Sequence, residues 1–328
     1  MATGIGSLPY DEPDEAARVV TGELPDLPHL PELPLRGAGA EMIGRTAALL
    51  VDLHVDLQPA GWRLTDRAGA DERRAYSLLR SDLDAFEIAA LGYTGPLKLQ
   101  VAGPLTLAAS IERPRGDRAL ADYGARRDLS QSLAEGLREH MADVAKRVPG
   151  AQIVVQVDEP SLPAVLAGAI PTSSGFGRLR AVDSSEAEYL LQEVAQAAGG
   201  WPVVHCCAAD VPVQLFQRAG AKAVALDVAL LSGGVLDELA EAVDAGLAVW
   251  PGVVPNRRPD HVLSDRDLVE RLERLYARLD VDPVEVAAGS VVTPACGLAG
   301  ADVGWAREAY RLARDAAKGF AEHVGVAG

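Results

Sequence analysis

A histidine and two cysteines are the residues of this chain best suited to metal chemistry. His205 and Cys207 are separated by one residue in an apolar run. Residues i and i+2 of a β-strand point to the same side of a sheet, so both side chains can reach one ion while Cys206 points the other way. Cys296 follows another apolar run, and Asp227 ends a third.

These residues form a candidate set of metal ligands. Two thiolates, one imidazole and one carboxylate suit tetrahedral zinc. The set comprises His205, Cys207, Asp227 and Cys296. The alternative is structural, because cysteine is a common core residue and a single His-x-Cys pair is weak evidence for a metal. The position of all four residues at strand ends favours zinc.

Asp158 is a second candidate, in the segment Asp158-Glu159-Pro160 that follows an apolar run. A buried carboxylate at this position can bind a substrate ammonium group. The alternative is an aspartate that caps the following turn. Ser7 and Thr106 offer hydroxyl groups for binding, and each is equally well explained as a turn residue.

The elements that must position these residues alternate between short apolar runs and longer amphipathic stretches, which indicates a parallel α/β sheet. Eight runs are expected to form strands: Thr3–Leu8, His54–Trp62, Leu97–Ala102, Gln152–Val157, Trp201–Cys207, Ala223–Val228, Leu247–Val254 and Gly289–Ala295. Eight strands predict a closed (β/α)₈ TIM barrel, whose active site lies at the carboxyl ends of the strands. The alternative is a doubly wound open sheet, but no G-x-G-x-x-G follows the first strand.

Helices are expected over Glu41–Leu53, Ser130–Val148, Ser185–Ala198, Leu236–Ala245, Ser264–Leu279 and Ala301–His323. Gly22–Pro34 contains four prolines, so we expect a long loop over the barrel rim. Ile170–Gly177 is expected to be a flexible loop that covers a site. With no repeat or low-complexity linker, residues 1–328 are expected to form one domain.

Composition excludes several classes of protein. The formal net charge of −16 disfavours nucleic acid and anionic membranes as partners. Three cysteines are too few for a secreted disulfide scaffold. The sequence has no secretory signal and no apolar run long enough for a transmembrane helix, so we expect a cytoplasmic protein.

Seven short segments, in the same order along nearly the whole chain, resemble the catalytic C-terminal barrel of cobalamin-independent methionine synthase. They are Ile5-Gly6-Ser7-Leu8-Pro9, Gly61-Trp62, Gly103-Pro104-Leu105-Thr106, Gln156-Val157-Asp158-Glu159-Pro160, His205-Cys206-Cys207, Pro251-Gly252-Val253 and Pro294-Ala295-Cys296-Gly297-Leu298. Their common order is more specific than any one motif.

The resemblance implies a zinc ion held by His205, Cys207, Asp227 and Cys296. The acidic ligand of the family is usually Glu, so Asp227 is a departure. In the family, zinc activates the thiol of homocysteine, which accepts a methyl group and becomes methionine. By resemblance, Ile5, Gly6, Ser7 and Asp158 hold the amino acid, and Asp158 is the catalytic residue.

Other family residues are replaced. A Glu that helps to hold the amino acid falls near Ala38, and two folate-contacting residues fall near Ser110 and Ala164. The proton-donating His falls near Arg257. The sequence therefore predicts a zinc-dependent thiol methyltransferase whose donor differs from the usual polyglutamated methylfolate. A methyl-corrinoid, free or protein-bound, is the alternative donor, and the choice between folate and corrinoid stays open.

Two further alternatives stay open. Uroporphyrinogen decarboxylase-like barrels share the architecture without a metal, although the His-x-Cys pair and the late cysteine argue against this class. A non-catalytic relative that keeps zinc for structure or binding is the other, and four protein ligands with no open position would favour it.

Overall fold

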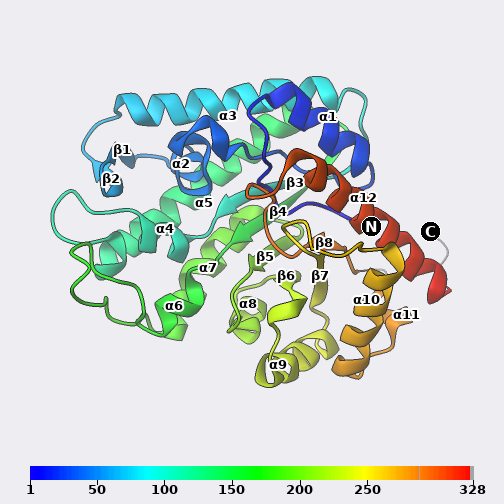
Figure 1. Cartoon of the computed structure of the whole chain (residues 1–328). Helices are drawn as coiled ribbons and strands as arrows, with labels where there is room; N and C mark the ends of the chain where they lie inside the picture. Colours follow the sequence, from blue (N-terminus) through cyan, green and yellow to red (C-terminus); the bar gives the residue numbers. More distant parts are fainter. Residues whose placement is uncertain (288, 326–328) are drawn as a thin grey trace.

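Six parallel strands form the regular part of the sheet, in the order β3-β4-β5-β6-β7-β8 (Figure 1). The structure is a computed structural model that describes residues 1–287 and 289–325. The strands span Gly95–Ala102 (β3), Ala151–Asp158 (β4), Pro202–Cys206 (β5), Ala223–Asp227 (β6), Ala248–Val254 (β7) and Thr293–Pro294 (β8). The six carboxyl ends therefore lie at one edge of the sheet.

Two irregular segments close this sheet into a barrel. Ala2 makes a parallel bridge with Val292, beside β8, and Ser7 makes one with Glu32. His29 makes a third with Lys98 of β3. The chain near Ala2–Ser7 is thus the first barrel position and the chain near His29–Glu32 is the second. The prediction of an α/β barrel is confirmed.

The prediction that Gly22–Pro34 is a loop over the rim was wrong. Prolines lack an amide hydrogen, but their carbonyl groups still accept hydrogen bonds. Lys98 N donates to Pro28 O at 2.9 Å, and Leu30 N donates to Lys98 O at 3.0 Å. The side chains of Leu24, Leu27, Leu30 and Leu33 are all buried. The part of the segment near His29–Glu32 therefore occupies a barrel position through isolated bridges, without forming a regular strand.

The predicted strand His54–Trp62 is also corrected. It spans a turn between two antiparallel strands, β1 (His54–Gln58) and β2 (Gly61–Thr65), which form a two-stranded sheet of their own. The turn residues Pro59 and Ala60 follow an apolar–polar alternation, which concealed the reversal of the chain. This hairpin lies outside the barrel sheet.

Helices surround the sheet in Figure 1. The long ones are α1 (Pro13–Glu23), α3 (Ala70–Ala89), α5 (Tyr123–Arg147), α7 (Ser184–Ala198), α9 (Gly233–Asp244), α10 (Asp265–Leu279) and α12 (Val303–His323). Shorter ones are α2 (Met42–Ala47), α4 (Pro104–Ser110), α6 (Leu162–Leu166), α8 (Val213–Arg218), α11 (Pro283–Ala287) and the 3-10 turns η1 (Pro34–Arg36), η2 (Ala38–Ala40), η3 (Ala119–Ala121) and η4 (Val228–Leu230). In the described part of the chain, no helix has the length and apolar character needed to cross a membrane.

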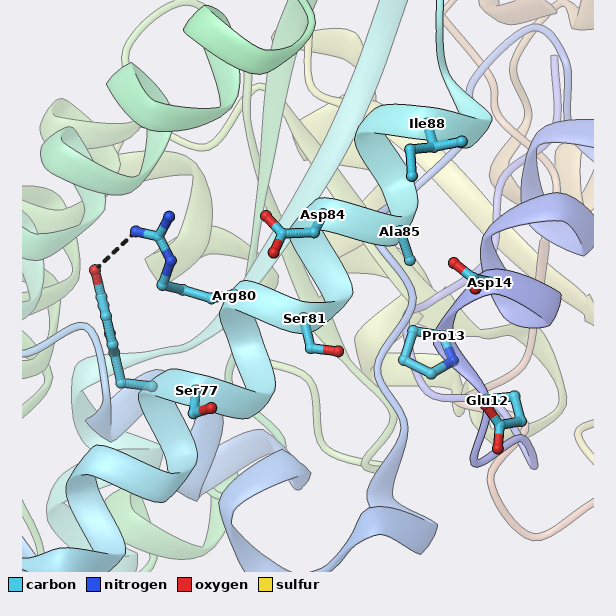
Figure 2. A pocket seen from close by; sticks show the side chains of 10 residues that line it. Glu12, Pro13, Asp14, Ser77, Arg80, Ser81, Asp84, Ala85 and Ile88 are labelled. Atoms are coloured by element: carbon cyan, nitrogen blue, oxygen red, sulfur yellow. Dashed lines mark hydrogen bonds between the residues drawn. The ribbon is translucent and has the colours of Figure 1, made fainter.

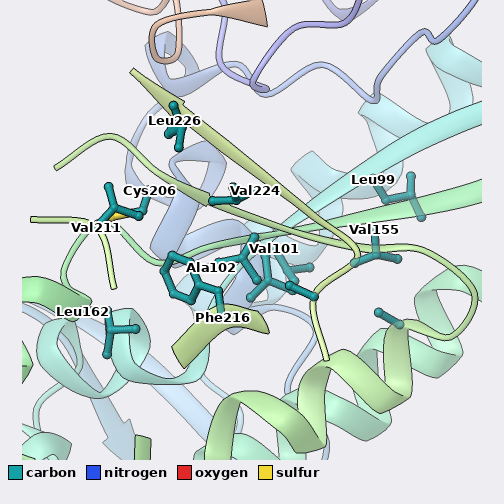
Figure 3. Close-up of a cluster of buried hydrophobic side chains, with 14 of the residues drawn as sticks. Leu99, Val101, Ala102, Val155, Leu162, Cys206, Val211, Phe216, Val224 and Leu226 are labelled. Atoms are coloured by element: carbon teal, nitrogen blue, oxygen red, sulfur yellow. The ribbon is translucent and has the colours of Figure 1, made fainter. Parts of the chain in front are cut away.

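The alternation of side chains along each strand divides the core into two layers. Figure 3 shows the outer layer, where Cys206 lies among side chains such as Val224 and Phe216 under the helices. A second cluster that includes Val203, Ala225 and Trp250 fills the barrel interior. His205 faces the same side as Val203, as the strand periodicity predicts.

The segment Ile170–Gly177 forms an exposed turn closed by an antiparallel bridge between Pro171 and Arg178. The side chain of Phe176 is 99% exposed. Ser173 N donates to Asp117 Oδ1 at 3.0 Å. The role of this segment as a cover stays a prediction.

Candidate metal centre

The structure brings His205, Cys207 and Cys296 together at the carboxyl edge of the barrel. Their ligand atoms all lie within 4.8 Å of one another. His205 belongs to β5, Cys207 follows it directly, and Cys296 follows β8. The two sulfur atoms are 3.1 Å apart, which is longer than a disulfide bond of about 2.05 Å, and both cysteines are free.

His205 is oriented by Asp158. The Nδ1 atom of His205 lies 2.7 Å from Asp158 Oδ1, and the same oxygen accepts a hydrogen bond from Gln156 Nε2 at 2.8 Å. The other ring nitrogen, Nε2, is buried and has no hydrogen-bond partner among the described residues. A histidine that binds a metal commonly has this arrangement, with one nitrogen held by a carboxylate and the other free for the ion.

The charges of the cluster are strongly coupled. A hydrogen bond between the two sulfur atoms lowers the pKa of Cys296 to about 4 against the effect of burial, and His205 adds to this lowering. The same hydrogen bond raises the pKa of Cys207. Burial opposes protonation of His205, but the hydrogen bond with Asp158 and the charge of Cys296 raise its pKa to about 9. The pocket thus holds one thiolate close to a cation, and a metal ion can take the place of the proton.

This donor set fits zinc. Two cysteine sulfurs and one imidazole nitrogen are three of the four ligands of a tetrahedral site. The unpartnered Nε2 atom is a buried polar atom that a metal ion would satisfy. The fourth position is then available to another ligand, as in catalytic zinc sites.

Asp227 lies at the end of β6, but its carboxylate is not among the three clustered groups. Its side chain accepts a hydrogen bond from Ala229 N at 2.9 Å and caps η4. Burial raises the pKa of Asp227. Its role as the fourth zinc ligand stays a prediction.

A cavity of about 310 Å³ opens beside the cluster. Its lining includes two sequence candidates besides Asp158 and the metal ligands, namely Ile5 and Ser7. Gly6 is not among the lining residues, but a side chain there would crowd the site, because a Cβ atom would lie 3.1 Å from Glu32 Cδ. The first barrel position therefore forms one wall of this cavity, which we call the thiol cavity.

Glu32 is the residue of this site that the sequence analysis missed. It lines the thiol cavity, and only 6% of its surface is exposed. Burial raises the pKa of Glu32 to about 7, with a smaller lowering by Arg45. Ala38, where an acidic residue was expected to be lost, belongs to η2 and does not line the cavity. The acidic residue was overlooked because the Pro-rich segment around it was assigned to a loop.

Lys98 lies in the barrel interior and belongs to the hydrogen-bond network that includes Asp158 and Glu32. It is fully buried, and its Nζ atom donates to Ile5 O at 2.9 Å and to Gln156 Oε1 at 2.8 Å. Gln156 in turn donates to Asp158, while Gln100 Nε2 lies 3.3 Å from Glu32 Oε1. The barrel interior therefore holds the acidic side chains of the thiol cavity in fixed positions.

Glu159 and Thr106 have a structural role in this site. Glu159 accepts hydrogen bonds from Leu105 N at 2.8 Å, Thr106 N at 2.9 Å and Thr106 Oγ1 at 2.7 Å. These donors lie in the first turn of α4. Glu159 thus binds the amino end of α4 and leaves Asp158 to face the cavity.

A larger surface hollow of about 750 Å³ lies between α1 and α3, away from the metal centre. Figure 2 shows its lining, including Asp14, Arg80 and Asp84, with Arg80 hydrogen-bonded to the Tyr76 hydroxyl. Neither a histidine nor a cysteine lines this hollow. Its residues do not form a metal-binding set.

Comparison with known proteins gives two positive findings. A family model described as "Cobalamin-independent synthase, Catalytic domain" matches residues 1–319. The chain is also similar to a solved structure of a B12-independent methionine synthase from Shewanella sp. W3-18-1 in complex with selenomethionine. That similarity has a TM-score of 0.63 and 12% sequence identity, and it covers 99% of both chains. Comparison with curated proteins finds no match.

Proposed function

Because the chain belongs to the family of cobalamin-independent methionine synthase catalytic domains, we propose that it is a zinc-dependent methyltransferase whose acceptor is the thiol of homocysteine. The observation that carries the proposal is the buried, unpartnered Nε2 atom of His205 beside two free thiols. Zinc held by His205, Cys207 and Cys296 would lower the pKa of a substrate thiol, so that the thiol reacts as a thiolate. The product would be methionine.

The acidic side chains of the thiol cavity support an amino acid as the acceptor. Glu32 and Asp158 line the cavity with Ile5 and Ser7. Carboxylates bind an ammonium group by charge-assisted hydrogen bonds. A volume of about 310 Å³ is at the lower end of the range for small-molecule sites. We propose that Glu32 and Asp158 bind the substrate ammonium group and direct its thiol toward the metal.

Asp158 has a second role in this proposal. Its Oδ1 atom holds Nδ1 of His205, which keeps Nε2 directed toward the cluster. Loss of this carboxylate would affect both the metal and the amino acid. We therefore propose Asp158 as the catalytic residue that joins the two binding functions.

The methyl donor is proposed to be a methyl-corrinoid. Small side chains stand at Ser110 and Ala164, on α4 and α6, where the resemblance places residues that contact folate. Neither side chain offers an aromatic surface or a carboxylate for a pterin ring. A donor bound in another manner fits this replacement better than methylfolate does.

The first experiment is elemental analysis of zinc in protein purified without added metal. We expect close to one zinc per chain in the wild type, and loss of zinc in Cys207→Ser and in Cys296→Ser. Cys206→Ala is the matched control, because this neighbouring cysteine lies in the outer core layer. A wild type without zinc, unchanged by zinc added under reducing conditions, would falsify the proposal.

Activity is tested separately, on zinc-loaded protein. Methylcobalamin and methyltetrahydrofolate are each supplied with homocysteine, and methionine is measured. We expect methionine with methylcobalamin. Methionine from methyltetrahydrofolate alone would overturn the proposed donor and leave the acceptor in place.

A further inference from the structure

A second cavity, of about 500 Å³, opens beside the metal centre at the ends of β6, β7 and β8. Asp227, Gly252 and Ala295 line it from these strands or directly after them, and three arginines line it from α10. The arginines are Arg271, Arg274 and Arg278. We call this space the arginine cavity.

The three arginines are spaced to face one side of their helix. Positions i, i+3 and i+7 of an α-helix lie on one face. Arg271 is held in place, because its Nη1 atom donates to Val253 O at 2.8 Å. None of the three makes an ion pair in the described part of the chain, whereas Arg266 of the same helix pairs with Glu270. Their guanidinium groups are therefore available to a ligand.

The charge of the arginine cavity is opposite to that of the whole chain. The chain has a formal net charge of −16, yet Asp227 is the only acidic residue among the described residues that line the cavity. The carboxylate of Asp227 already accepts a hydrogen bond from Ala229 N. Three guanidinium groups against one carboxylate leave a net positive cavity, which attracts anions.

The other residues that line the arginine cavity indicate the chemical character of its ligand. Val228, Val253, Pro255 and Leu275 provide apolar surface, and Asn256 provides an amide. A ligand with an apolar body and at least two negative groups would use both kinds of surface. Guanidinium groups bind carboxylates and phosphates in a bidentate manner, so either group fits.

We propose that the arginine cavity is a binding site for a small organic anion that carries at least two carboxylate or phosphate groups. The site is distinct from the thiol cavity, which is lined by Glu32 and Asp158. The two cavities lie close together, because Ala295 lines one and its neighbour Cys296 lines the other. The proposal concerns binding alone and does not depend on methyl transfer.

The test is isothermal titration of the full chain with inorganic pyrophosphate and with citrate as probes. We expect at least one probe to bind, more weakly as salt increases. Binding of pyrophosphate alone would identify a phosphate site, and binding of citrate alone a carboxylate site. If neither probe binds at low salt, the proposal is overturned and the arginines are a solvated helix face.

The double variant Arg274→Gln/Arg278→Gln locates the binding. These two residues are exposed and make no side-chain hydrogen bond to another described residue, whereas Arg271 is left intact because it binds the backbone. We expect about tenfold weaker binding for each arginine removed, the loss of one charge-assisted hydrogen bond. Arg266→Gln is the matched control. Equal affinity in the double variant, or an equal loss in the control, would overturn the assignment.

Discussion

Asp158 makes the contact that fixes the ring of His205, and this contact can be tested without removing a metal ligand. Asp158→Asn retains the size of the side chain but removes its negative charge. Because a carboxylate partner strengthens a metal-binding histidine, we expect zinc affinity to fall about 10- to 100-fold. Competition with a chromogenic chelator measures this change. Unchanged affinity would show that Asp158 does not act through His205.

The same chelator competition, carried out on Asp227→Asn, tests whether Asp227 is the fourth zinc ligand. The structure places the Asp227 carboxylate on Ala229 N, outside the cluster of three. Weaker zinc binding in this variant would support Asp227 as a ligand. Affinity equal to the wild type would leave the fourth position to the substrate thiol.

The buried side chain of Lys98 should make the free energy of unfolding depend on pH. Burial lowers the pKa of Lys98 to about 7, although Asp158 and Glu32 oppose this shift. Between about pH 7 and 10, the unfolded chain therefore binds more protons at this lysine than the folded chain does, and stability increases with pH. The Ile5 carbonyl group and the side chains of Gln100 and Gln156 accept hydrogen bonds from Lys98 Nζ.

Lys98→Met removes this titration. We expect the free energy of unfolding of the wild type, relative to the variant, to rise as the pH increases from about 7 to 10. Urea denaturation at several pH values measures the difference, in which the effects of titrating groups distant from Lys98 cancel. A difference that is constant with pH would contradict the buried lysine's role.

At the scale of elements, the second barrel position depends on a contact with α12. His29 Nε2 lies 2.8 Å from the Tyr310 hydroxyl, and both side chains are buried. Gly4, in the first barrel position, is packed against this pair, since a Cβ atom would lie 2.4 Å from each of these two polar atoms. Three segments that are distant in sequence thus meet at one hydrogen bond.

Substitutions at this contact should destabilise the barrel. We expect Tyr310→Phe to cost about 1–3 kcal/mol, because it leaves a buried histidine nitrogen without a partner. Gly4→Ala should cost about 1–3 kcal/mol through overpacking. Gly22→Ala in α1 is the control, because a Cβ atom there lies within 4 Å of no described atom outside its chain neighbours and the adjacent helix backbone. Chemical denaturation measures all three variants, and equal stability of Gly4→Ala and the control would refute this account.

The elements that sequence reasoning found and missed differ in their physical signals. β4 to β7 are apolar runs bounded by turns, so their positions were predicted to within a few residues. The second barrel position has buried leucines at every third residue, Leu24 to Leu33, with prolines between them. That period matches neither a helix nor a regular strand. It is the repeat of an extended Pro-rich chain, and it was the signal that could have identified the segment.

The site shows the same division. The sequence analysis selected His205, Cys207 and Cys296 because they lie at or just after the ends of predicted strands and have side chains that bind metals. Glu32 was missed because its segment was assigned to a loop. Lys98 was missed because this residue of β3 comes near the carboxylates of Asp158 and Glu32 only when the barrel closes. The local sequence pattern predicts candidate ligands at strand ends. It does not predict contacts across the barrel, because these form only when the sheet closes.

At the scale of the whole molecule, the candidate metal centre brings together residues from β5 and from the segment after β8, which are separated in sequence by β6 and β7. Cys207 follows β5 and Cys296 follows β8. An ion bound only by the folded chain stabilises it in proportion to the logarithm of its concentration over its dissociation constant. We expect removal of zinc by a chelator to lower the melting temperature by a few degrees.

Differential scanning calorimetry with and without chelator measures this shift. Cys207→Ser is the control, because its melting temperature should not respond to the chelator. A wild-type melting temperature that does not change after verified loss of zinc would show that the ion does not support the fold. Limited proteolysis of the same samples tests the proposal that residues 1–328 form one domain.

The 3.1 Å separation of the Cys207 and Cys296 sulfur atoms has a consequence for damage and repair. Both thiols are partly exposed, whereas Cys206 is buried in the outer core layer. An oxidant therefore meets this pair first, and its two-electron oxidation to a disulfide would remove both sulfur ligands of the proposed zinc ion together. A reductant restores both together. Under the zinc proposal, oxidation of this pair would therefore release the metal, and reduction would be needed before the metal could bind again.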